Sequence, residues 1–349
     1  MTESVDNAKA ASSDLPNDRL SEPKARAKRR PTHDLIQTIK EYADKLAGDG
    51  TTRGDLKILS RTLRELRYAF KVFSPYRHRR KITVFGSART PQEAPTYQQA
   101  VQLGRAMSEE DWLVITGAAS GIMEAGHRGS GRKHAMGLNI MLPFEQESNP
   151  IIAGDKKLVH MKYFFTRKLM FVKECDAVAC LPGGFGTLDE ALEVLTLMQT
   201  GKQNIIPVVL LDAPGGTFWN TFHRFVLEQL LHGDMISDED LHLYKITDSY
   251  EAAVREIIHF YSNYHSMRYV KGKLVVRMHR SLSSERLQAL NERFSDILTD
   301  GTFEQSAPLE AELDEVHLAH KPRLVFEFNR RNHGRLRQLI DYINQPDSE

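Results

Sequence analysis

Short apolar runs alternate with helical stretches through the middle of the chain. KITVFGS, which starts at Lys81, is followed by WLVIT, LNIML, DAVACL and IIPVVLL, and glycine or proline bounds such runs, as is typical of buried strands. Helical patterns separate these runs, near residues 93–110, 162–173, 188–200 and 218–231. Strands that alternate with helices predict βαβ units. We therefore expect a Rossmann-like, doubly wound α/β domain over residues 78–265, with a mostly parallel sheet and helices on both of its faces.

Ahead of this domain the apolar residues follow a helical period. They recur from Leu35 to Leu46 and again from Leu56 to Phe70, which predicts two helices in an N-terminal appendage over residues 31–77. The opposite face of the second helix is basic, with Lys57, Arg61, Arg64 and Arg67. Helices of this kind are suited to packing or to assembly.

Residues 1–30 are polar and contain no aromatic side chain. A segment with so little apolar surface cannot offset the entropy of ordering, so we expect a disordered tail. The tail ends in a basic cluster between Lys24 and Arg30. Two interpretations of this cluster stay open: a solvated tail, or contact with nucleic acid or an acidic partner.

After about residue 266 the pattern starts again on a smaller scale. LVVRM is typical of a strand, a helical stripe runs from Leu287 to Ile297, RLVFEF alternates like a half-buried strand, and a last helical stripe runs from Leu336 to Ile343. This order predicts a small C-terminal βαβα lobe over residues 266–349.

Composition narrows the class of protein. Of the 349 residues, 47 are lysine or arginine and 46 are aspartate or glutamate, which makes a nucleic-acid-binding role unlikely because such proteins carry a strong positive excess. Two cysteines, Cys175 and Cys180, are too few for a disulfide framework and lack zinc-ligand spacing. No apolar stretch is long enough to span a membrane, and the first residues lack the apolar core of a signal peptide. We therefore expect a cytoplasmic protein without a metal site.

The segment CLPGGFGTLDE carries the clearest chemical signal. It joins the predicted strand DAVACL to a helix, and Gly183, Gly184 and Gly186 let the backbone turn tightly and approach a ligand. Thr187 then opens the helix. The free N–H groups and positive dipole end of a helix favour an anion such as phosphate.

Glu190 has two interpretations at this stage. Thr187-x-x-Glu190 matches a capping box, in which the glutamate bonds back to the start of the helix. Alternatively, Glu190 points into the cleft beside the phosphate loop, where a carboxylate stabilises a sugar cation or activates water.

Other well-known motifs are missing. The sequence contains no GxxxxGK[ST] and no complete GxGxxG, so it gives little support to an NTPase or a hydride-transfer enzyme. The histidines are scattered, and no HExxH occurs. We expect His127, His134 and His160 to be ordinary core or surface residues rather than ligands.

PGGFGTLDE matches the PGGxGTxxE signature of the Lonely Guy (LOG) family of nucleoside 5′-monophosphate phosphoribohydrolases. The resemblance runs from about Lys81 to Tyr264 and includes VFGSA, TGAASGIMEAGHRG, TRKLMF and LTLMQTGK in the same order. It implies hydrolysis of the N-glycosidic bond of a nucleoside monophosphate without a cofactor, in a homodimer or larger homo-oligomer. Such proteins have also been labelled lysine decarboxylases, which implies a pyridoxal phosphate lysine that nothing in this sequence favours.

The resemblance also implies roles for individual residues. Glu190 and Arg167 match the catalytic pair of the family. Gly183, Gly184, Gly186 and Thr187 would hold the 5′-phosphate, and the nucleotide pocket would include Ser87, Gly117, Gly121, Met123, Glu124 and Lys168. The chemistry is consistent, because cleavage builds positive charge on the ribose that a carboxylate stabilises, while an arginine forks onto phosphate or ribose oxygens.

The chain departs from compact family members at several positions. Gly117-Ala118-Ala119-Ser120 stands where those members carry a glycine-rich triplet, and Phe164 and Phe171 replace methionines on either side of Arg167. The sequence therefore predicts no base preference among purine, pyrimidine and cytokinin-type nucleotides. A nucleotide-sensing or carrier protein on the same fold is the alternative function.

Overall fold

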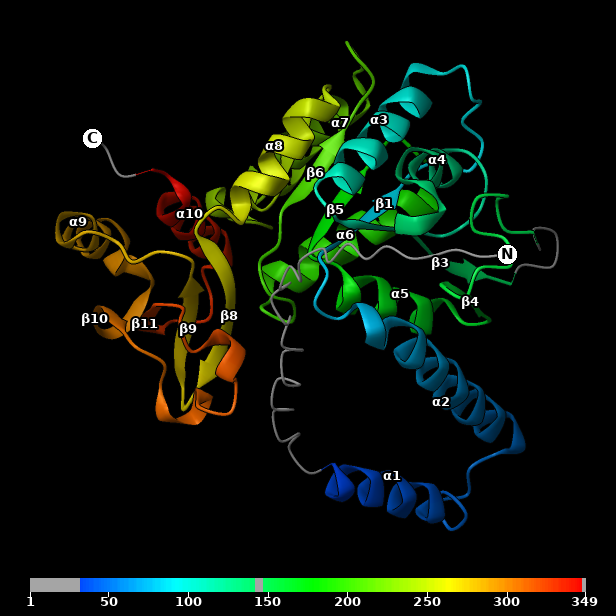
Figure 1. The fold of residues 1–349 in the computed structure, drawn as a ribbon, viewed down its shortest axis with the longest axis horizontal. Helices are drawn as coiled ribbons and strands as arrows, with labels where there is room; N and C mark the ends of the chain where they lie inside the picture. Colours follow the sequence, from blue (N-terminus) through cyan, green and yellow to red (C-terminus); the bar gives the residue numbers. More distant parts are fainter. Residues whose placement is uncertain (1–31, 142–146, 347–349) are drawn as a thin grey trace, which may run out of the picture.

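Seven parallel strands form the larger sheet of the structure, a computed structural model that describes residues 32–141 and 147–346 (Figure 1). The strands are β1 (Lys81–Phe85), β2 (Leu113–Thr116), β3 (Ala135–Ile140), β4 (Leu158–Met161), β5 (Ala177–Cys180), β6 (Val208–Leu211) and β7 (Lys245–Thr247). They lie in the order β4-β3-β2-β1-β5-β6-β7, and every neighbouring pair is parallel. The predicted parallel sheet is confirmed, and the predicted tail at residues 1–30, with its basic cluster, lies outside the described residues.

Helices cover both faces of this sheet, as the alternation of strands and helices predicts. The helices of this part of the chain are α3 (Pro95–Glu109), α4 (Ile122–His134), α5 (Phe164–Glu174), α6 (Phe185–Gln199), α7 (Phe218–Phe225, continued by a π-helical turn at Val226–Leu231), η3 (Asp238–Leu243) and α8 (Tyr250–Phe260). On one face, Ile82 and Val84 of β1 pack with α3, α4 and α8. On the other face, Phe85 packs with α5 and α6. Side chains of a strand alternate between faces, so each strand contributes to two layers of core.

The N-terminal appendage consists of α1 (His33–Lys45) and α2 (Arg53–Phe73), with a short 3₁₀ turn at Ser74–Tyr76. A capping box between Thr52 and Asp55 begins α2. Glu65, Ala69 and Phe73 are its buried residues, and α2 contacts β4 and α5. In contrast, α1 buries none of its residues, and Figure 1 shows it standing away from the sheet.

The C-terminal lobe holds a second, antiparallel sheet in the order β10-β11-β9-β8. Its elements are β8 (Tyr264–Val270), β9 (Lys273–Met278), α9 (Ser284–Phe294), β10 (Leu298–Ser306), β11 (Arg323–Phe328) and α10 (His333–Asn344), with 3₁₀ turns at Ser295–Ile297, Glu310–Glu312 and Val316–Leu318. The predicted strands LVVRM and RLVFEF correspond to β9 and β11, and both predicted helices are present. The structure adds β8 and β10, whose polar residues give no clear apolar pattern; most residues of β10 are exposed, whereas Tyr269 is the one exposed residue of β8.

The lobe and the larger sheet share one apolar core. A single cluster of buried side chains runs from Met198 and Val208 through Phe260 and Tyr264 to Leu336. At this junction the side chain of Asn344 accepts the N–H groups of Asn263 and Tyr264 at 2.9 and 2.8 Å. It also donates to the carbonyl of Phe260 at 2.6 Å. The last helix therefore closes the connection between α8 and β8.

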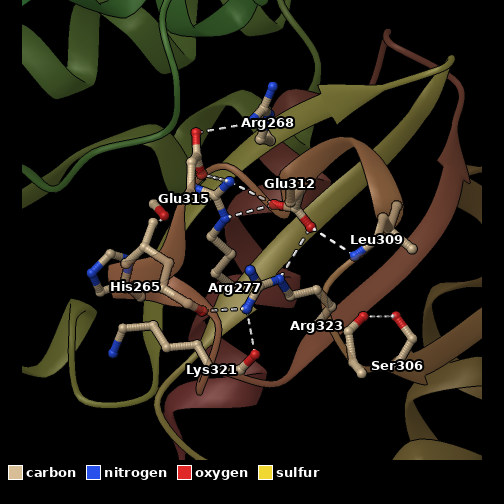
Figure 2. A network of polar contacts seen from close by, with 12 residues as sticks. His265, Arg268, Arg277, Ser306, Leu309, Glu312, Glu315, Lys321 and Arg323 are labelled. Carbon is tan, nitrogen blue, oxygen red and sulfur yellow. Dashed lines mark hydrogen bonds and ion pairs between the residues drawn. The ribbon is translucent and has the colours of Figure 1, made fainter. Parts of the chain in front are cut away.

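A buried ionic network holds the lobe together (Figure 2). Arg277 and Arg323, from neighbouring strands, donate to opposite oxygens of Glu312 at 2.9 and 3.1 Å. Arg323 and the Glu312 side chain are fully buried. Burial raises the pKa of Glu312, but the bonds from Arg277 and Arg323 outweigh it, and the pKa is lowered overall. The carboxylate is therefore held charged between two cations.

Several single-residue expectations can be compared with the described part of the chain. Cys175 and Cys180 are buried free thiols, as small apolar residues would be. His127 is fully buried and bonded to Thr116 and to the carbonyl of Met136, which confirms it as a core residue. Within residues 32–141 and 147–346, no helix is long and apolar enough to cross a membrane. No cluster of potential metal ligands occurs among these residues either.

Candidate active site

A pocket beside the glycine loops lies where the strand order reverses. The chain runs outward from β1 through β2, β3 and β4, and then crosses to β5 on the other side of β1. In parallel sheets this point leaves a crevice at the carboxyl ends of the strands. A pocket of about 500 Å³ is found there, lined by Phe85, Gly86, Ser87, Ala88, Arg89, Gly117, Met123, Arg167, Phe171, Gly184, Phe185, Gly186, Thr187 and Glu190. This volume suits a small ligand such as a nucleotide.

The loop between β5 and α6 forms one wall of the pocket. Helix α6 begins at Phe185 with Gly184 as its N-cap residue, so the first N–H groups of the helix lie at the pocket. A Cβ atom added to Gly184 or Gly186 would meet no atom within 4 Å, which leaves the backbone open to a ligand. A Cβ atom on Gly183 would lie only 2.1 Å from Oγ1 of Thr187, so only glycine fits there. The wall therefore has the free N–H groups and the open backbone that favour an anion.

Glu190 faces the pocket and does not cap the helix. Because α6 begins at Phe185 and has no side-chain cap, the capping-box interpretation of Thr187 and Glu190 is wrong. Glu190 is 5% exposed, and its Oε1 lies 3.9 Å from Nη2 of Arg167. The two residues of the predicted catalytic pair thus come from neighbouring helices, α6 and α5, and meet in one pocket.

The electrostatics of the pair favour reactivity over a simple ion pair. Burial raises the pKa of Glu190 to about 7, although Lys168 and Arg167 act in the opposite direction. Burial likewise lowers the pKa of Arg167, against the attraction of Glu190. An arginine still keeps its charge at neutral pH. A carboxyl group that titrates near neutrality in a pocket is typical of a catalytic site.

Arg167 keeps donors available for a ligand. Its guanidinium lies over the rings of Phe164 and Phe171, at 5.0 and 5.6 Å from their centroids. Its buried Nε has no hydrogen-bond partner among the described residues. Aromatic rings fix the plane of the guanidinium without using its N–H groups. The two phenylalanines that distinguish this chain therefore orient Arg167.

Three of the predicted pocket residues line the pocket, and three lie outside its lining. Ser87, Gly117 and Met123 line it. Lys168 instead binds Asp189 and Glu193 at 2.8 and 2.5 Å, which ties α5 to α6. Glu124 accepts a bond from Arg128 at 2.9 Å, and Gly121 has φ 62° with its added Cβ 2.3 Å from the carbonyl of Ser87. These three residues therefore contact neighbouring residues around the pocket and are not part of its lining.

The altered turn after β2 leaves the pocket open. Ala118 adopts a left-handed backbone, φ 60°, and is fully buried with Ile152 and Leu158. Its methyl group therefore packs into the core and does not line the pocket. At Gly117, an added Cβ would lie 2.7 Å from Sδ of Met123 and 3.7 Å from Nη1 of Arg167. Glycine at position 117 keeps the approach to the arginine clear.

Sequence reasoning missed five lining residues, namely Phe85, Gly86, Ala88, Arg89 and Phe185. Arg89 is exposed, and no hydrogen bond or ion pair of its side chain occurs within the described residues. Its signal was a basic residue in the turn after the first predicted strand. Phe185 is 93% exposed at the start of α6. Its sequence signal was a large apolar residue between two glycines of the predicted phosphate loop.

Comparisons with known proteins give consistent matches. A family model described as "Possible lysine decarboxylase" matches residues 116–257. Cytokinin riboside 5′-monophosphate phosphoribohydrolase LOG7 of Arabidopsis thaliana is 35% identical over 140 residues, 38% of this chain and 60% of that relative. The chain thus spans less than two thirds of LOG7. Probable cytokinin riboside 5′-monophosphate phosphoribohydrolase LOG6 of Arabidopsis thaliana is 34% identical over 142 residues, 39% of this chain and 68% of that relative.

Among solved structures, the molybdenum cofactor binding protein from the phototrophic bacterium Rippkaea orientalis matches with a TM-score of 0.34 and 19% identity. The match covers 51% of this chain and 94% of that protein.

Proposed function

The chain belongs to the Lonely Guy (LOG) family, and from this premise we propose that it hydrolyses the N-glycosidic bond of a nucleoside 5′-monophosphate. The products are the free base and ribose 5-phosphate. One observation supports the proposal above all: a buried carboxylate, Glu190, lies 3.9 Å from Arg167 in a pocket whose wall is the start of a helix. Carboxylate, cation and anion site are the three groups that this reaction requires.

The proposed mechanism assigns each group a physical task. The start of α6, with Gly184, Gly186 and Thr187, holds the 5′-phosphate through N–H groups and the helix dipole. Arg167 fixes the phosphate or ribose by a forked pair of N–H groups. As the base leaves, positive charge develops on the ribose, and ionised Glu190 stabilises it. Glu190 then accepts a proton from the water whose oxygen bonds to C1′ of the ribose, and this proton passes to the nitrogen of the departing base, which leaves the base neutral and Glu190 ionised again.

The apolar part of the pocket is suited to the base. Phe85 and Phe171 meet edge to face with ring centroids 5.0 Å apart, and Met123 lies on the same pocket lining. A flat heterocycle gains contact against such walls, whichever base it is. The proposal is therefore for ordinary purine or pyrimidine nucleotides as well as cytokinin-type nucleotides.

The pocket does not fit the chemistry of a pyridoxal phosphate decarboxylase. That cofactor needs a lysine amine to form its Schiff base. No lysine occurs among the described residues that line the pocket. Lys168, the lysine next to Arg167, is engaged by Asp189 and Glu193. The name of the matching family model is therefore a poor guide to the reaction.

A panel of nucleotides tests the proposal directly. Purified protein is incubated with AMP, GMP, IMP, CMP and UMP, and ribose 5-phosphate is measured. We expect release from at least one of them, and a loss of about 100-fold or more in Glu190→Gln, since removing a transition-state charge costs this much. Asp189→Asn, at an exposed carboxylate one residue away, is the control and keeps its activity.

Two outcomes would overturn the proposal. One is that no nucleotide yields ribose 5-phosphate, and the other is that Glu190→Gln releases it at the wild-type rate. If calorimetry then shows tight nucleotide binding without turnover, the protein acts as a nucleotide sensor or carrier.

We also propose that the protein forms a homodimer next to the pocket. The support is a set of large apolar side chains on the outer surfaces of α5 and α6. Phe164, Phe165, Leu169, Phe185 and Leu192 are between 44% and 93% exposed. Exposed apolar side chains gathered in this way are typical of interfaces.

The mass of the protein in solution tests the homodimer. Light scattering should give at least twice the 39.8 kDa chain mass, and Phe165→Asp with Leu192→Asp should return the monomer mass. A wild-type monomer mass would contradict the proposal.

A further inference from the structure

A second pocket carries a marked excess of positive charge and lies away from the glycine loop. It has a volume of about 490 Å³ and lies between α2 and the turn that leads into α5. Its lining is basic except for one leucine, one serine and one tyrosine; it consists of Arg53, Leu56, Lys57, Ser60, Arg61, Arg64, Lys162 and Tyr163. We call it the α2 pocket. No acidic side chain is part of this lining among the described residues.

Among the residues that the structure describes, acidic side chains leave most charges of the α2 pocket without a partner. Helix α2 carries six lysines and arginines but only two acids, Asp55 and Glu65. Asp55 is used in the capping box with Thr52, and Glu65 is buried beneath the helix. Among the described residues, Arg61 is the one pocket cation with an acidic partner, Glu65 at 2.7 Å. Within the described residues, no ion pair involves Arg53, Lys57 or Arg64.

This arrangement does not favour the helix on its own. The basic residues of α2 recur at intervals of three and four, so they lie on one face and repel one another. Arg53 also lies in the first turn, where the helix dipole disfavours a cation. A bound anion would relieve both costs. If these residues were only solvated surface side chains, nothing would require them to line a pocket.

The geometry points to a linear oligophosphate as the ligand of the α2 pocket, and we propose it as a binding site distinct from the active site. From Arg53 to Arg64 the helix rises about 16 Å, which is longer than one phosphate group can bridge. Several phosphate groups in a row match this stripe of cations. The Ser60 hydroxyl adds a neutral donor within the same lining. The chain of phosphates can be free or part of a nucleotide.

The α2 pocket shares an element with the proposed active site. Lys162 and Tyr163 line it, and the carbonyl of Tyr163 accepts the N–H of Arg167 at 3.3 Å. The start of α5 therefore lies between the two pockets. An anion at Lys162 acts on the same turn that carries Arg167.

Binding of inorganic tripolyphosphate to the full chain, measured by calorimetry, tests the inference. The pocket variant is Arg53→Ser, Lys57→Ser and Arg64→Ser. Its matched control is Lys40→Ser, Arg67→Ser and Lys71→Ser, which removes the same charge from α1 and α2 outside the α2 pocket. We expect affinity to fall by more than about tenfold in the pocket variant and by less than about twofold in the control. Both variants keep the glycine loop, so binding there does not distinguish them.

Two further measurements identify the source of the phosphate groups and provide for a variant that does not fold. ATP that binds much more tightly than tripolyphosphate indicates a nucleotide ligand, and equal affinities indicate a free oligophosphate. If the triple variant does not fold, the pair Lys57→Ala and Arg64→Ala is compared with Arg67→Ala and Lys71→Ala.

Three results would overturn the inference: no binding by the wild-type protein, equal losses in pocket variant and control, or tighter binding of a single-stranded oligonucleotide that the pocket variant abolishes. Release of ribose 5-phosphate is measured separately on the same variants. Its loss or persistence bears on the proposed reaction and not on this site.

Discussion

At the scale of single residues, the most informative feature is a carboxylate that is difficult to ionise. Glu190 is 5% exposed, and burial raises its pKa to about 7. Near neutral pH it is therefore present in both forms. Only the ionised form can stabilise a positive ribose or accept a proton from water.

The rate of the proposed reaction should follow the ionisation of Glu190. We expect kcat/KM for the best nucleotide to rise through about pH 7 and to level off above it, because the carboxylate is the active form. The measurement is a pH profile between pH 5.5 and pH 8.5, about 1.5 units on either side of that pKa. A rate that falls over this range would mean that protonated Glu190 is the working form.

The ionisation of Glu190 should also affect the stability of the protein, but in the opposite direction: the free energy of unfolding falls with rising pH while the rate rises. The folded-state pKa of Glu190, about 7, lies above its ordinary value of 4.5, so the folded protein holds the proton more firmly than the unfolded chain. Stability therefore falls as pH rises from about 4.5 to 7, by up to about 3 kcal/mol. Glu190→Gln removes this loss, so it should stabilise the protein at pH 8 and change little at pH 4.5.

Urea unfolding at the two pH values measures this difference. Asp189→Asn, at an exposed neighbouring carboxylate, is the control and should show no such dependence. Equal effects of Glu190→Gln at both pH values would contradict the explanation.

The sequence predicted the residues of the site better than its surroundings. Glu190, Arg167, Gly184 and Gly186, which the motif singles out, line one pocket, because their spacing is set by short connections between strand and helix. It did not reveal Arg89 or Phe85, since their approach to the pocket depends on how β1 lies against β5. It also left open whether Glu190 caps its helix, which only the observed start of α6 decides.

At the scale of elements, one buried carboxylate joins the appendage to α5, the helix that carries Arg167. Glu65 of α2 accepts the backbone N–H of Lys162 at 3.0 Å and the hydroxyl of Thr166 at 2.9 Å. It also binds Arg61 at 2.7 Å. Burial raises the pKa of Glu65, but these bonds outweigh it, and the pKa is lowered overall. Thr166 precedes Arg167, so α2 helps to position the arginine.

Removing this carboxylate should weaken both the fold and the active site. Glu65→Ala leaves the N–H of Lys162 and the charge of Arg61 without their acceptor, while the hydroxyl of Thr166 keeps the carbonyl of Tyr163, and we expect a loss of about 2–4 kcal/mol in unfolding free energy. With Thr166→Val, the double-mutant cycle should give a coupling of about 0.5–3 kcal/mol. Additive losses would mean that the bond does not join the helices.

The kinetic effect separates positioning from general damage. Glu65→Ala should lower kcat while the substrate KM changes little. Glu65→Gln, which keeps an acceptor oxygen, should restore part of kcat. Glu41→Ala on exposed α1 is the control and should alter neither quantity.

The sequence predicted α2 and its basic face but not the hydrogen bonds from α5 and the preceding turn to Glu65. A glutamate among basic residues is ordinary on a solvated helix, and its burial follows only from the packing of α2 on α5. Strands β8 and β10 were missed for a related reason. Polar residues interrupt the apolar pattern of both strands, and their pairing with β9 and β11 forms them more than their own composition does.

At the scale of the whole molecule, the two sheets should unfold together. The apolar cluster runs without a break from α5 and α6 into the lobe. Sequence periodicity found both sheets but could not show that they share a core, because it describes each element alone. A continuous core predicts one cooperative transition.

Variants of the buried ionic network in the lobe test whether the two sheets unfold together. Glu312→Ala leaves Arg277 and Arg323 without their shared buried partner, and we expect a loss of about 3–5 kcal/mol. Glu315→Ala removes a carboxylate that is 31% exposed and should cost much less. Calorimetry should show a single peak that moves as a whole in Glu312→Ala. Two separate peaks would mean that the lobe unfolds on its own.

The junction at Asn344 also orders the events of biosynthesis. A growing chain leaves the ribosome N-terminus first, so all seven strands of the larger sheet emerge well before Asn344 does. Until then, the N–H groups of Asn263 and Tyr264 and the carbonyl of Phe260 must bond to water instead of the Asn344 side chain. The nascent protein therefore passes through a stage in which all strands of the larger sheet have been synthesised, but the connection between α8 and β8 is still exposed to solvent.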